Sequence, residues 1–365
     1  MTQLNGKVAL QTKGQAMPEQ PIRFAIIGND HNHAYNHVRL LRNAGAELAT
    51  FYSDKPALIA EFNKFYPDVP LAPSMEAILE DPQIDVIGGS AMPAERAGIS
   101  IKAMQHGKDV LADKPAVTTL EQLAEIQRIQ RETGRIWCLY SNEHYDRRCT
   151  LRAGELVAQG AIGRVVQTTG FGPHKTRLPA RPAWFFDRGI SGGIIGDIGA
   201  HQIEQFLFFT GSKTASIISA QTGNFAHPMH PEFEDYGDVS LQGDGGLGWF
   251  RVDWYTPASL EVPGDIRLFV LGTDGYMEMR KYYDPAGRPG DEHLFVVDSK
   301  GTHFVDTTNV PLTFGSRFLD DVRNRTETAM GQERSFLVTR LATEAQLGAR
   351  RVVCLNSANV GAQGG

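Results

Sequence analysis

Strand-like and helix-like stretches alternate over the first 140 residues, and this alternation restricts the possible folds more than any other feature. Phe24 to Ile27 form a short apolar run that stops at Gly28, and an amphipathic stretch over 34–44 follows. The same order then repeats. Further strands are predicted over 47–51, 85–87, 108–112 and 136–140, and further helices over 57–65, 94–105 and 118–131. The last helix is expected to begin with a capping box of Thr118 and Glu121.

Strands separated by helices at this spacing indicate a parallel sheet, because right-handed crossovers return each strand in the same direction. We therefore expect a Rossmann-type, doubly wound sheet with helices on both faces. In such a sheet, ligands bind beyond the carboxyl ends of the strands. Residues directly after the predicted strands are thus the first candidates for a binding site.

The pattern changes at about residue 146. Period-two runs such as DVSLQG, GWFRVDWY and HLFVVD, separated by Gly, Pro and Asp, predict a mostly antiparallel sheet. Helices are predicted over 151–158, 314–323 and 336–350. The expected fold class is α/β, in which the Rossmann-type sheet is followed by an α+β domain with a large open sheet. We expect domains over 22–145 and 146–353, with flexible tails over 1–21 and 354–365.

Composition argues against several classes of partner. The chain has 36 Lys and Arg against 42 Asp and Glu, a formal net charge of −6, so we expect no nucleic acid as a partner. No apolar run reaches the roughly 18 residues of a membrane span, and we expect neither a membrane partner nor a secretory signal. The three cysteines, Cys138, Cys149 and Cys354, have no metal-ligand spacing and are typical of reduced thiols in a cytoplasmic protein.

The first motif is GNDHNHA over 28–34, at the first turn from strand to helix. A dinucleotide fingerprint has glycines at its first, third and sixth positions, so that the backbone can approach the pyrophosphate. Only Gly28 fits, because Asp30 and His33 occupy the other two positions. An Asp30 carboxylate aimed at one phosphate charge from ~5 Å would cost about 3 kcal/mol at an effective dielectric of ~20. Either Asp30 points away from the phosphates, or no phosphates bind there.

The same motif allows two other interpretations. Asp30, His31 and His33, with His37 one turn on, resemble a metal-ligand set. Their side chains could instead cap the helix that begins near residue 34, or line a cofactor loop. The sequence favours capping or lining over a metal.

The second predicted strand ends at Ser53, Asp54 and Lys55, where a carboxylate normally binds the adenosine ribose. Asp54 favours NAD, whereas Ser53 and Lys55 would tolerate the additional phosphate of NADP. The motif GKDVLADKP over 107–115 places Lys114 directly after another strand, and Pro115 stiffens the turn. Lys114 therefore belongs to the ligand side of the sheet.

The third motif is SGGIIGDIGAHQIEQF over 191–206. Its glycines allow the backbone to approach a ligand. The helix that follows places Asp197, His201 and Glu204 at i, i+4 and i+7, which is one face of a helix. A carboxylate one turn from an imidazole can orient it, as a general base needs.

The chain resembles the glucose–fructose oxidoreductase/inositol dehydrogenase (Gfo/Idh/MocA) family over about residues 22–352. Six segments together carry this resemblance: GKDVLADKP, GGIIGDIGAH, QGAIGRVVQ, RPAWFF, LGTDGYMEMR and SFLVTRLATEAQLGAR. The resemblance implies an NAD(P)-dependent oxidoreductase that acts on a carbinol or ketone carbon of a sugar, polyol or related compound. It implies that Lys114 contacts both cofactor and substrate, that Asp197 orients the substrate and that His201 is the general acid/base. The sequence does not distinguish NAD from NADP, although Asp54 favours NAD.

The expected site residues form overlapping sets. The cofactor would be bound by Gly28, Asn29, Asp30, His31, His33, Ser53, Asp54, Lys55, Lys114 and Pro115. The substrate would be bound by Lys114, Asp197, His201, His174 and Trp184. The open second sheet leads us to expect a homodimer or homotetramer. Two alternatives remain: a metal-dependent hydrolase or lyase that uses Asp30, His31 and His33, and a family member that has become a ligand sensor.

Overall fold

The computed structural model describes residues 20–353, apart from the side chain of residue 179. The predicted tails and Cys354 therefore lie almost entirely outside the described residues. Residues 22–140 form a five-stranded parallel sheet in the order β2-β1-β3-β4-β5. Its strands are β1 (Arg23–Ile27), β2 (Glu47–Tyr52), β3 (Val86–Gly88), β4 (Asp109–Ala112) and β5 (Trp137–Leu139). The strand order reverses at β1, and ligands bind at such a switch point in open parallel sheets.

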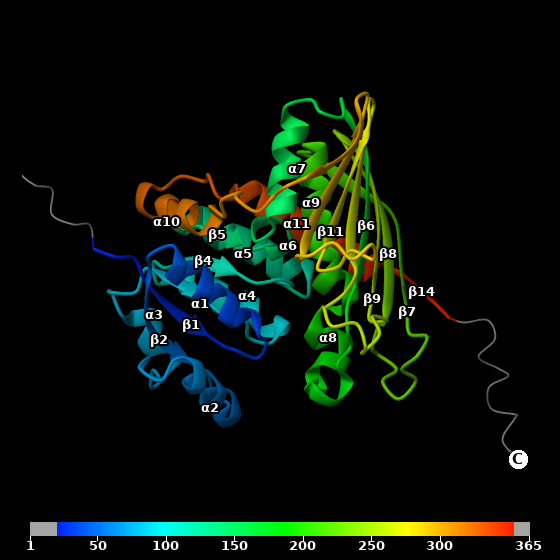
Figure 1. The fold of residues 1–365 in the computed structure, drawn as a ribbon. Helices are drawn as coiled ribbons and strands as arrows, with labels where there is room; N and C mark the ends of the chain where they lie inside the picture. The colour runs from blue at the N-terminus through cyan, green and yellow to red at the C-terminus, as the bar shows by residue number, and fades with distance from the viewer. Residues whose placement is uncertain (1–19, 354–365) are drawn as a thin grey trace, which may run out of the picture.

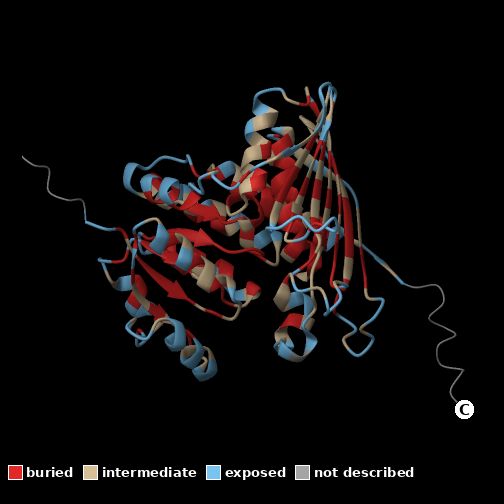
Figure 2. Cartoon of the chain, viewed as in Figure 1, coloured by how far each residue is buried: buried red, intermediate tan, exposed pale blue. Residues whose placement is uncertain are grey.

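Helices cover both faces of this sheet (Figure 1). They are α1 (His33–Asn43), α2 (Pro56–Phe65), α3 (Met75–Glu80), α4 (Pro93–Gln105) and α5 (Leu120–Thr133). Figure 2 shows that the strands between these helices are almost wholly buried, which explains why the sequences of the strands are mainly continuous apolar runs. The predicted doubly wound parallel sheet is confirmed, whereas α3 was not predicted.

The predicted capping box of α5 is wrong by one residue. Thr119 is the N-cap, its Oγ1 accepts a hydrogen bond from the Gln122 backbone N at 3.2 Å, and Gln122 Oε1 accepts from the Thr119 N at 3.3 Å. Glu121 is exposed at the side of the first turn. A glutamine completes a capping box as well as a glutamate does, so the sequence allowed both positions.

The second half forms a nine-stranded sheet in the order β13-β12-β11-β10-β6-β9-β8-β7-β14. Neighbouring strands are antiparallel except for the pairs β6·β9 and β7·β14. The strands are β6 (Val165–Pro173), β7 (Ala215–Gly223), β8 (Tyr236–Gly243), β9 (Gly246–Asp253), β10 (Ile266–Gly272), β11 (Tyr276–Lys281), β12 (Glu292–Asp298), β13 (Gly301–Val305) and β14 (Arg350–Val352). The predicted large, mostly antiparallel sheet is confirmed.

Helices pack on the face of this sheet that is turned toward the first half (Figure 1). The helices of the second half are α6 (Asn142–Tyr145), α7 (Arg148–Ala158), α8 (Arg188–Ser191), a π-helical turn (Ile195–Gly199), α9 (Ala200–Thr210), α10 (Phe314–Asn324) and α11 (Gln332–Gly348), with two 3₁₀ turns at Leu178–Ala180 and Ala183–Phe186. None of the helices in residues 20–353 is long and apolar enough to cross a membrane.

The last two helices return to the first half. Helix α10 packs beside α1, and α11 lies along β5, the edge strand of the parallel sheet. Gln332 Oε1 accepts a hydrogen bond from the Trp137 backbone N at 3.0 Å, and Ser335 Oγ accepts from the Leu139 N at 3.2 Å. One apolar core therefore includes residues of both halves. The division at residue 145 stays a prediction.

Candidate active site

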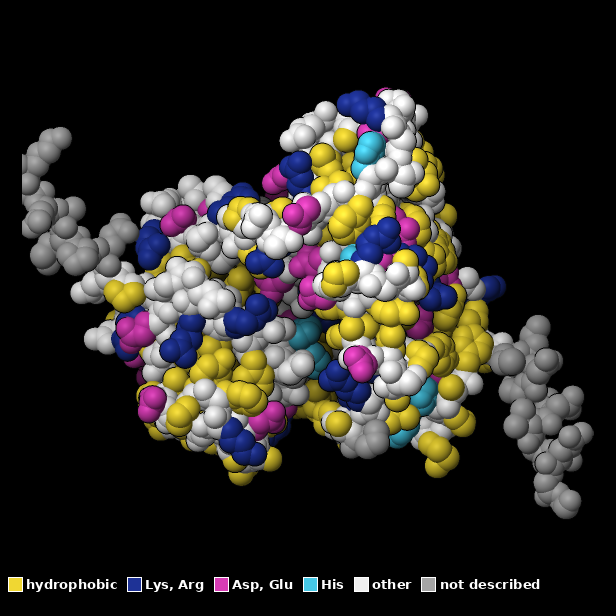
Figure 3. Space-filling model, in the orientation of Figure 1, with side chains coloured by type: hydrophobic (Ala, Val, Ile, Leu, Met, Phe, Trp, Pro, Cys, Tyr) yellow, Lys and Arg dark blue, Asp and Glu magenta, His cyan; other side chains and the backbone are white. Residues whose placement is uncertain are grey.

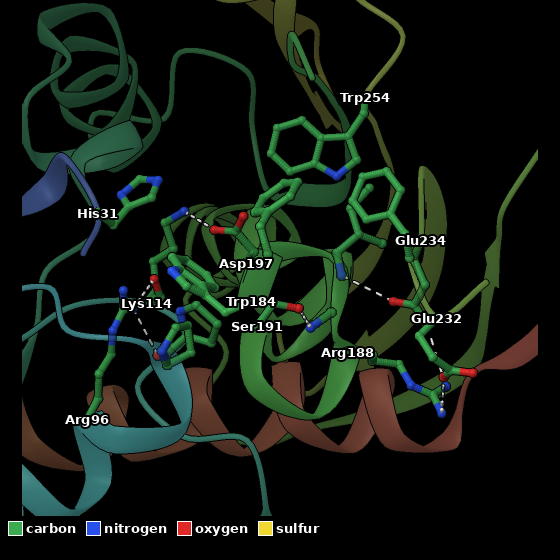
Figure 4. A pocket seen from close by; sticks show the side chains of 16 residues that line it. His31, Arg96, Lys114, Trp184, Arg188, Ser191, Asp197, Glu232, Glu234 and Trp254 are labelled. Atoms are coloured by element: carbon green, nitrogen blue, oxygen red, sulfur yellow. Dashed lines mark hydrogen bonds and ion pairs between the residues drawn. The ribbon is translucent and has the colours of Figure 1, made fainter. Parts of the chain in front are cut away.

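A cavity lies where the carboxyl end of the parallel sheet faces the helices of the second half. His31, Lys114 and Asp197 line one side of it, Glu234 and Trp254 line the other, and Trp184 also lines the cavity (Figure 4). A second, separate groove runs past Gly28, Asp30, Ser53 and Asp54 at the ends of β1 and β2. In Figure 3, histidine side chains are visible in the hollow between the two halves.

The turn after β1 requires glycine at its first position. Gly28 has a φ of 77°, and a Cβ there would lie 2.5 Å from the Cβ of Ala91. The Gly28 carbonyl accepts a hydrogen bond from the Ser90 N at 2.9 Å, and the Ser90 carbonyl accepts from the His31 N at 3.0 Å. The turn is thus held against the end of β3, with open groove beside it. The neighbouring Asn29 turns its side-chain amide away and donates to the Leu58 carbonyl at 3.0 Å.

Asp30 forms an ion pair with Lys55. Its carboxylate side chain is only 6% exposed, so the ion pair fixes the direction in which it points. Burial alone would lower the pKa of Lys55, but the bond to Asp30 raises it above its ordinary value. The predicted electrostatic cost of Asp30 is therefore offset by a partner that the sequence did not reveal.

The structure corrects the predicted metal-ligand set. Within residues 20–353, the group that could hold a metal is His31, His33 and Asp113, whose ligand atoms lie within 4.8 Å of one another. Asp30 is not part of it. His37 is fully buried, and its Nδ1 accepts a hydrogen bond from the Gly89 N at 3.2 Å.

Both carboxylate oxygens of Asp113 already have partners within the protein. Its Oδ1 lies 2.9 Å from His33 Nδ1, its Oδ2 bonds the Ser90 hydroxyl, and Arg96 lies 3.0 Å away. Burial would raise the pKa of Asp113, but Arg96 and His33 more than offset it and hold the pKa well below its ordinary value. A cation would therefore compete with Arg96 for this carboxylate.

Lys114 and Asp197 form the centre of the cavity wall. The Lys114 Nζ donates to Asp197 Oδ1 at 2.5 Å, which joins the end of β4 to the π-helical turn before α9. Burial would raise the pKa of Asp197, but the Lys114 ammonium, with His31 and His33, more than offsets burial and holds this pKa below its ordinary value. Asp197 is thus held as a carboxylate.

His201 is not oriented by Asp197, contrary to the prediction. Its Nδ1 lies 3.1 Å from the hydroxyl of Ser141, which follows β5. The predicted spacing assumed 3.6 residues per turn, whereas Ile195–Gly199 form a π-helical turn, and His201 lies in α9 after it. Glu204 also points elsewhere, since it bonds His144 Nδ1 at 3.0 Å. Burial and then the Lys114 charge hold the pKa of His201 well below its ordinary value, so the imidazole is neutral at pH 7.

The remaining predicted residues lie at both ends of the site. Trp184 lines the cavity. His174 bonds the Gly172 carbonyl at 3.1 Å and is close enough to Lys114 and Asp197 for their charges to act on its pKa, which burial lowers. In the groove, Ser53 is buried and its Oγ accepts from the Lys55 N at 3.3 Å, whereas Asp54 is exposed. Pro115 lines the cavity beside Lys114.

Sequence reasoning missed Ser141, Glu143, Arg188 and Glu234. Ser141 follows a parallel strand as Lys114 does, so strand ends alone could have indicated it. Glu143 is buried behind it, and Lys281, which is fully buried, lies 3.4 Å from its carboxylate. No motif in the sequence covered Arg188, the first residue of α8, or Glu234, which lies in the segment before β8.

The residues present fit a dinucleotide. The groove lies at the switch point of the strand order, any side chain at Gly28 would collide with Ala91 at the edge of this groove, and Asp54 is exposed at the end of β2. The negative charge of Asp30, which opposed this fit, is balanced by Lys55. Gly28, Asp54 and Lys114 would therefore hold the cofactor, with no metal needed in the groove.

Two family models match the chain. Residues 22–141 match an oxidoreductase family with an NAD-binding Rossmann fold, and residues 150–278 match a GFO/IDH/MocA C-terminal domain. A scyllo-inositol 2-dehydrogenase (NAD(+)) from Bacillus subtilis is 27% identical over 62% of both chains. A D-xylose dehydrogenase from Paenarthrobacter nicotinovorans is 27% identical over 49% of this chain and 50% of its own. The chain thus aligns with less than two thirds of the length of these curated relatives.

A solved structure from Erwinia carotovora atroseptica, named as an oxidoreductase, is 46% identical. It covers 91% of this chain and 100% of its own, with a TM-score of 0.89. A 3-ketoreductase from Actinomadura kijaniata has the same fold at 18% identity, with a TM-score of 0.73 over 91% of this chain and 99% of its own. The predicted family and the predicted NAD(P)-binding domain are confirmed. With both domain models in chain order, and a relative aligned along its full length, this chain belongs to the Gfo/Idh/MocA oxidoreductase family.

Proposed function

We propose that the protein is an NAD(P)-dependent oxidoreductase that acts on a carbinol or ketone carbon of a sugar, polyol or related compound. The observation that supports this most is the group of Lys114, Asp197 and His201 at the carboxyl end of the parallel sheet, in which Lys114 and His201 are buried and Lys114 is paired with Asp197. A nicotinamide dinucleotide, when bound, would accept or supply the hydride. The residues of this chain then have to orient the alcohol, exclude water and move one proton.

His201 is suited to take that proton. Its low pKa keeps the imidazole neutral, and with Nδ1 bonded to Ser141, Nε2 is the nitrogen left to accept the proton of a hydroxyl. Lys114 donates one N–H to Asp197 and keeps others for the substrate oxygen. In the reverse direction, the protonated His201 would return the proton to the alkoxide that forms from a ketone.

Cofactor choice follows from the ion pair in the groove. A cation at the end of β2 would favour the additional phosphate of NADP, but Lys55 is engaged by Asp30. Asp54, exposed at the same turn, suits the free ribose hydroxyls of NAD. We therefore propose NAD as the preferred cofactor.

Titration of the protein with NADH and NADPH, followed by tryptophan fluorescence, tests the proposal. We expect micromolar binding, tighter for NADH. In a panel of polyols and sugars that includes scyllo-inositol and D-xylose, His201→Asn should lose roughly 10²–10⁴-fold in turnover without a change in NADH affinity. Absence of binding by both cofactors would overturn the proposal.

A metal-dependent hydrolase or lyase remains as a second candidate, supported by the cluster of His31, His33 and Asp113. Elemental analysis of protein purified without added metal distinguishes the two. Zinc, iron and manganese all below one tenth of an equivalent would remove this candidate. The third interpretation, a ligand sensor, is less well supported, because a sensor has no need of a neutral base beside a positioned ammonium.

We also propose that the outer face of the large sheet joins copies of the chain into a homodimer or homotetramer. Alternate residues on this face are apolar and exposed, such as Leu247, Leu271 and Phe304, which are 43%, 45% and 50% exposed. Light scattering on the purified protein would test this, and a monomer at all concentrations would overturn it. The cytoplasmic location stays a prediction.

A further inference from the structure

The wall of the cavity opposite Lys114 differs in chemistry from the reacting side. Figure 4 shows Trp254, Glu234 and Arg188 there, away from Lys114. The aromatic side chains Trp184, Phe185 and Phe233 line the same cavity, and with Trp254 they form what we call the aromatic wall. If the proposed function holds, this wall contacts the part of the substrate that does not react. Its chemistry therefore indicates which substrates the site accepts.

Glu234 presents one unused acceptor. Its side chain is 1% exposed, and its Oε2 accepts hydrogen bonds from the Ile194 N at 3.2 Å and from Gln346 Nε2 at 2.8 Å. Its Oε1 has no hydrogen-bond partner among residues 20–353. The nearest cation is Arg188, 3.7 Å away with its side chain 46% exposed. A buried carboxylate oxygen without a donor is unfavourable, so a donor on a ligand would be stabilised there.

The cations that line the cavity already have partners in the described part of the chain. Lys114 is paired with Asp197, Arg96 with Asp113, and Arg188 lies between Glu232 and Glu234. A phosphate or carboxylate on the ligand would therefore be repelled by the Glu234 carboxylate, and the lysine and arginines that line the cavity each already have a carboxylate partner. This arrangement selects against anionic ligands.

The aromatic rings are held firmly. The ring of Phe185 packs edge-on against Trp254, with 5.3 Å between the ring centroids, and it packs at a tilt against Phe233, with 5.4 Å between the centroids. The Arg181 guanidinium lies over both Phe185 and Trp254. Rigid rings of this kind favour the flat C–H face of a saturated ring, since they lose little freedom on contact. A flexible open chain would lose more.

We propose that Glu234 is the specificity-determining anchor for a neutral, ring-shaped polyhydroxylated substrate that has neither phosphate nor carboxylate. One hydroxyl donates to Glu234 Oε1, and the C–H face of the ring lies on the aromatic wall. This inference rests on the proposed function for the reaction itself, but not for binding, which can be measured separately.

Saturation-transfer NMR on the wild-type protein provides the first test, with and without NADH. The probes are D-glucose and myo-inositol, with D-glucuronate and D-glucose 6-phosphate as their anionic counterparts. We expect the neutral probes to bind at least about tenfold more tightly than the anionic ones. Anionic probes that bind as well as the neutral ones, or neutral probes that do not bind, would overturn the proposal.

Two matched variants provide the second test. Glu234→Gln and Glu232→Gln each remove one negative charge from the same wall, but Glu232 is exposed, 61% of its side chain, whereas Glu234 holds the buried acceptor. We expect the loss of neutral-probe affinity to be at least about tenfold larger for Glu234→Gln than for Glu232→Gln. Equal losses of affinity in the two variants would show that the negative charge, and not the buried acceptor of Glu234, determines binding, and would overturn the proposed anchor. The probe comparison on the wild type needs no variant, so the proposal stays testable if Glu234→Gln does not fold.

The two proposals can fail separately. Neutral sugars that bind to a protein without affinity for NADH or NADPH would leave the anchor in place and overturn the oxidoreductase. If NADH binds but none of the neutral probes binds, the proposed oxidoreductase stands and the proposed Glu234 anchor is overturned.

Discussion

The ion pair between Lys55 and Asp30 allows an acidic residue to stand in a dinucleotide loop. We expect Lys55→Ala to weaken NADH binding by about a hundredfold, because an unpaired Asp30 carboxylate ~5 Å from a phosphate costs about 3 kcal/mol at an effective dielectric of ~20. Adding Asp30→Asn to Lys55→Ala should restore most of that affinity, since the repulsion is then removed at its source. Fluorescence titration with NADH measures the affinity of the wild type, of Lys55→Ala and of the double variant.

Lys64→Ala is the control for this cycle, because Lys64 is exposed in the last turn of α2, outside the groove. It should bind NADH as the wild type does. A double variant that binds no better than Lys55→Ala would contradict the explanation, and would mean that Lys55 contacts the cofactor directly.

At the level of single elements, the predictions were good wherever an element's own periodicity determines it. The helix over 34–44 and the strands of the parallel sheet lie within about a residue of their predicted positions. Helix α11 begins at Gln332, four residues before its predicted start at 336, because its first turn is buried by bonds to β5 and not by apolar side chains. The π-helical turn before α9 could not be predicted either, since spacing arguments assume 3.6 residues per turn.

The first turn of α11 replaces a missing sheet neighbour at β5. Gln332 accepts from the Trp137 N at 3.0 Å and donates to the Trp137 carbonyl at 2.7 Å. We expect Gln332→Leu to lower the free energy of unfolding by about 2–3 kcal/mol, because it leaves both buried backbone groups unpaired. Urea unfolding measures the change. Glu333→Leu, at the next, exposed position, is the control, and equal stability of the two variants would contradict this role.

At the scale of the whole molecule, some residues of the site could be predicted from the sequence and others could not. Lys114, Asp197 and His201 were found through family motifs, and the structure brings Lys114 and Asp197 to 2.5 Å. Their surroundings were not predictable, because each charge is balanced by a residue distant in the chain, as Asp197 is by Lys114. Pairings of this kind depend on how the two halves pack together, which no local pattern records.

Buried histidines make the stability of the whole molecule sensitive to acid. Burial lowers the pKa of His37 to about 4, from an ordinary value of 6.5. The unfolded chain therefore takes up a proton first as the pH falls below about 6.5, and stability decreases until about pH 4. His37 alone should account for about 2 kcal/mol of lost stability between pH 7.5 and pH 5. His31 and His201, whose pKa values are also lowered by burial, act in the same direction.

Urea unfolding of the wild type and of His37→Gln at pH 7.5 and pH 5 measures this contribution. The glutamine amide oxygen can still accept from the Gly89 N, so the variant keeps the local hydrogen bond but no longer titrates. We expect the pH-dependent loss to be about 2 kcal/mol smaller in His37→Gln than in the wild type. His106→Gln, at an exposed position, should show the full wild-type loss. An identical loss in His37→Gln and the wild type would mean that His37 stays accessible to protons in the folded protein, and that the acid sensitivity arises at the other buried histidines.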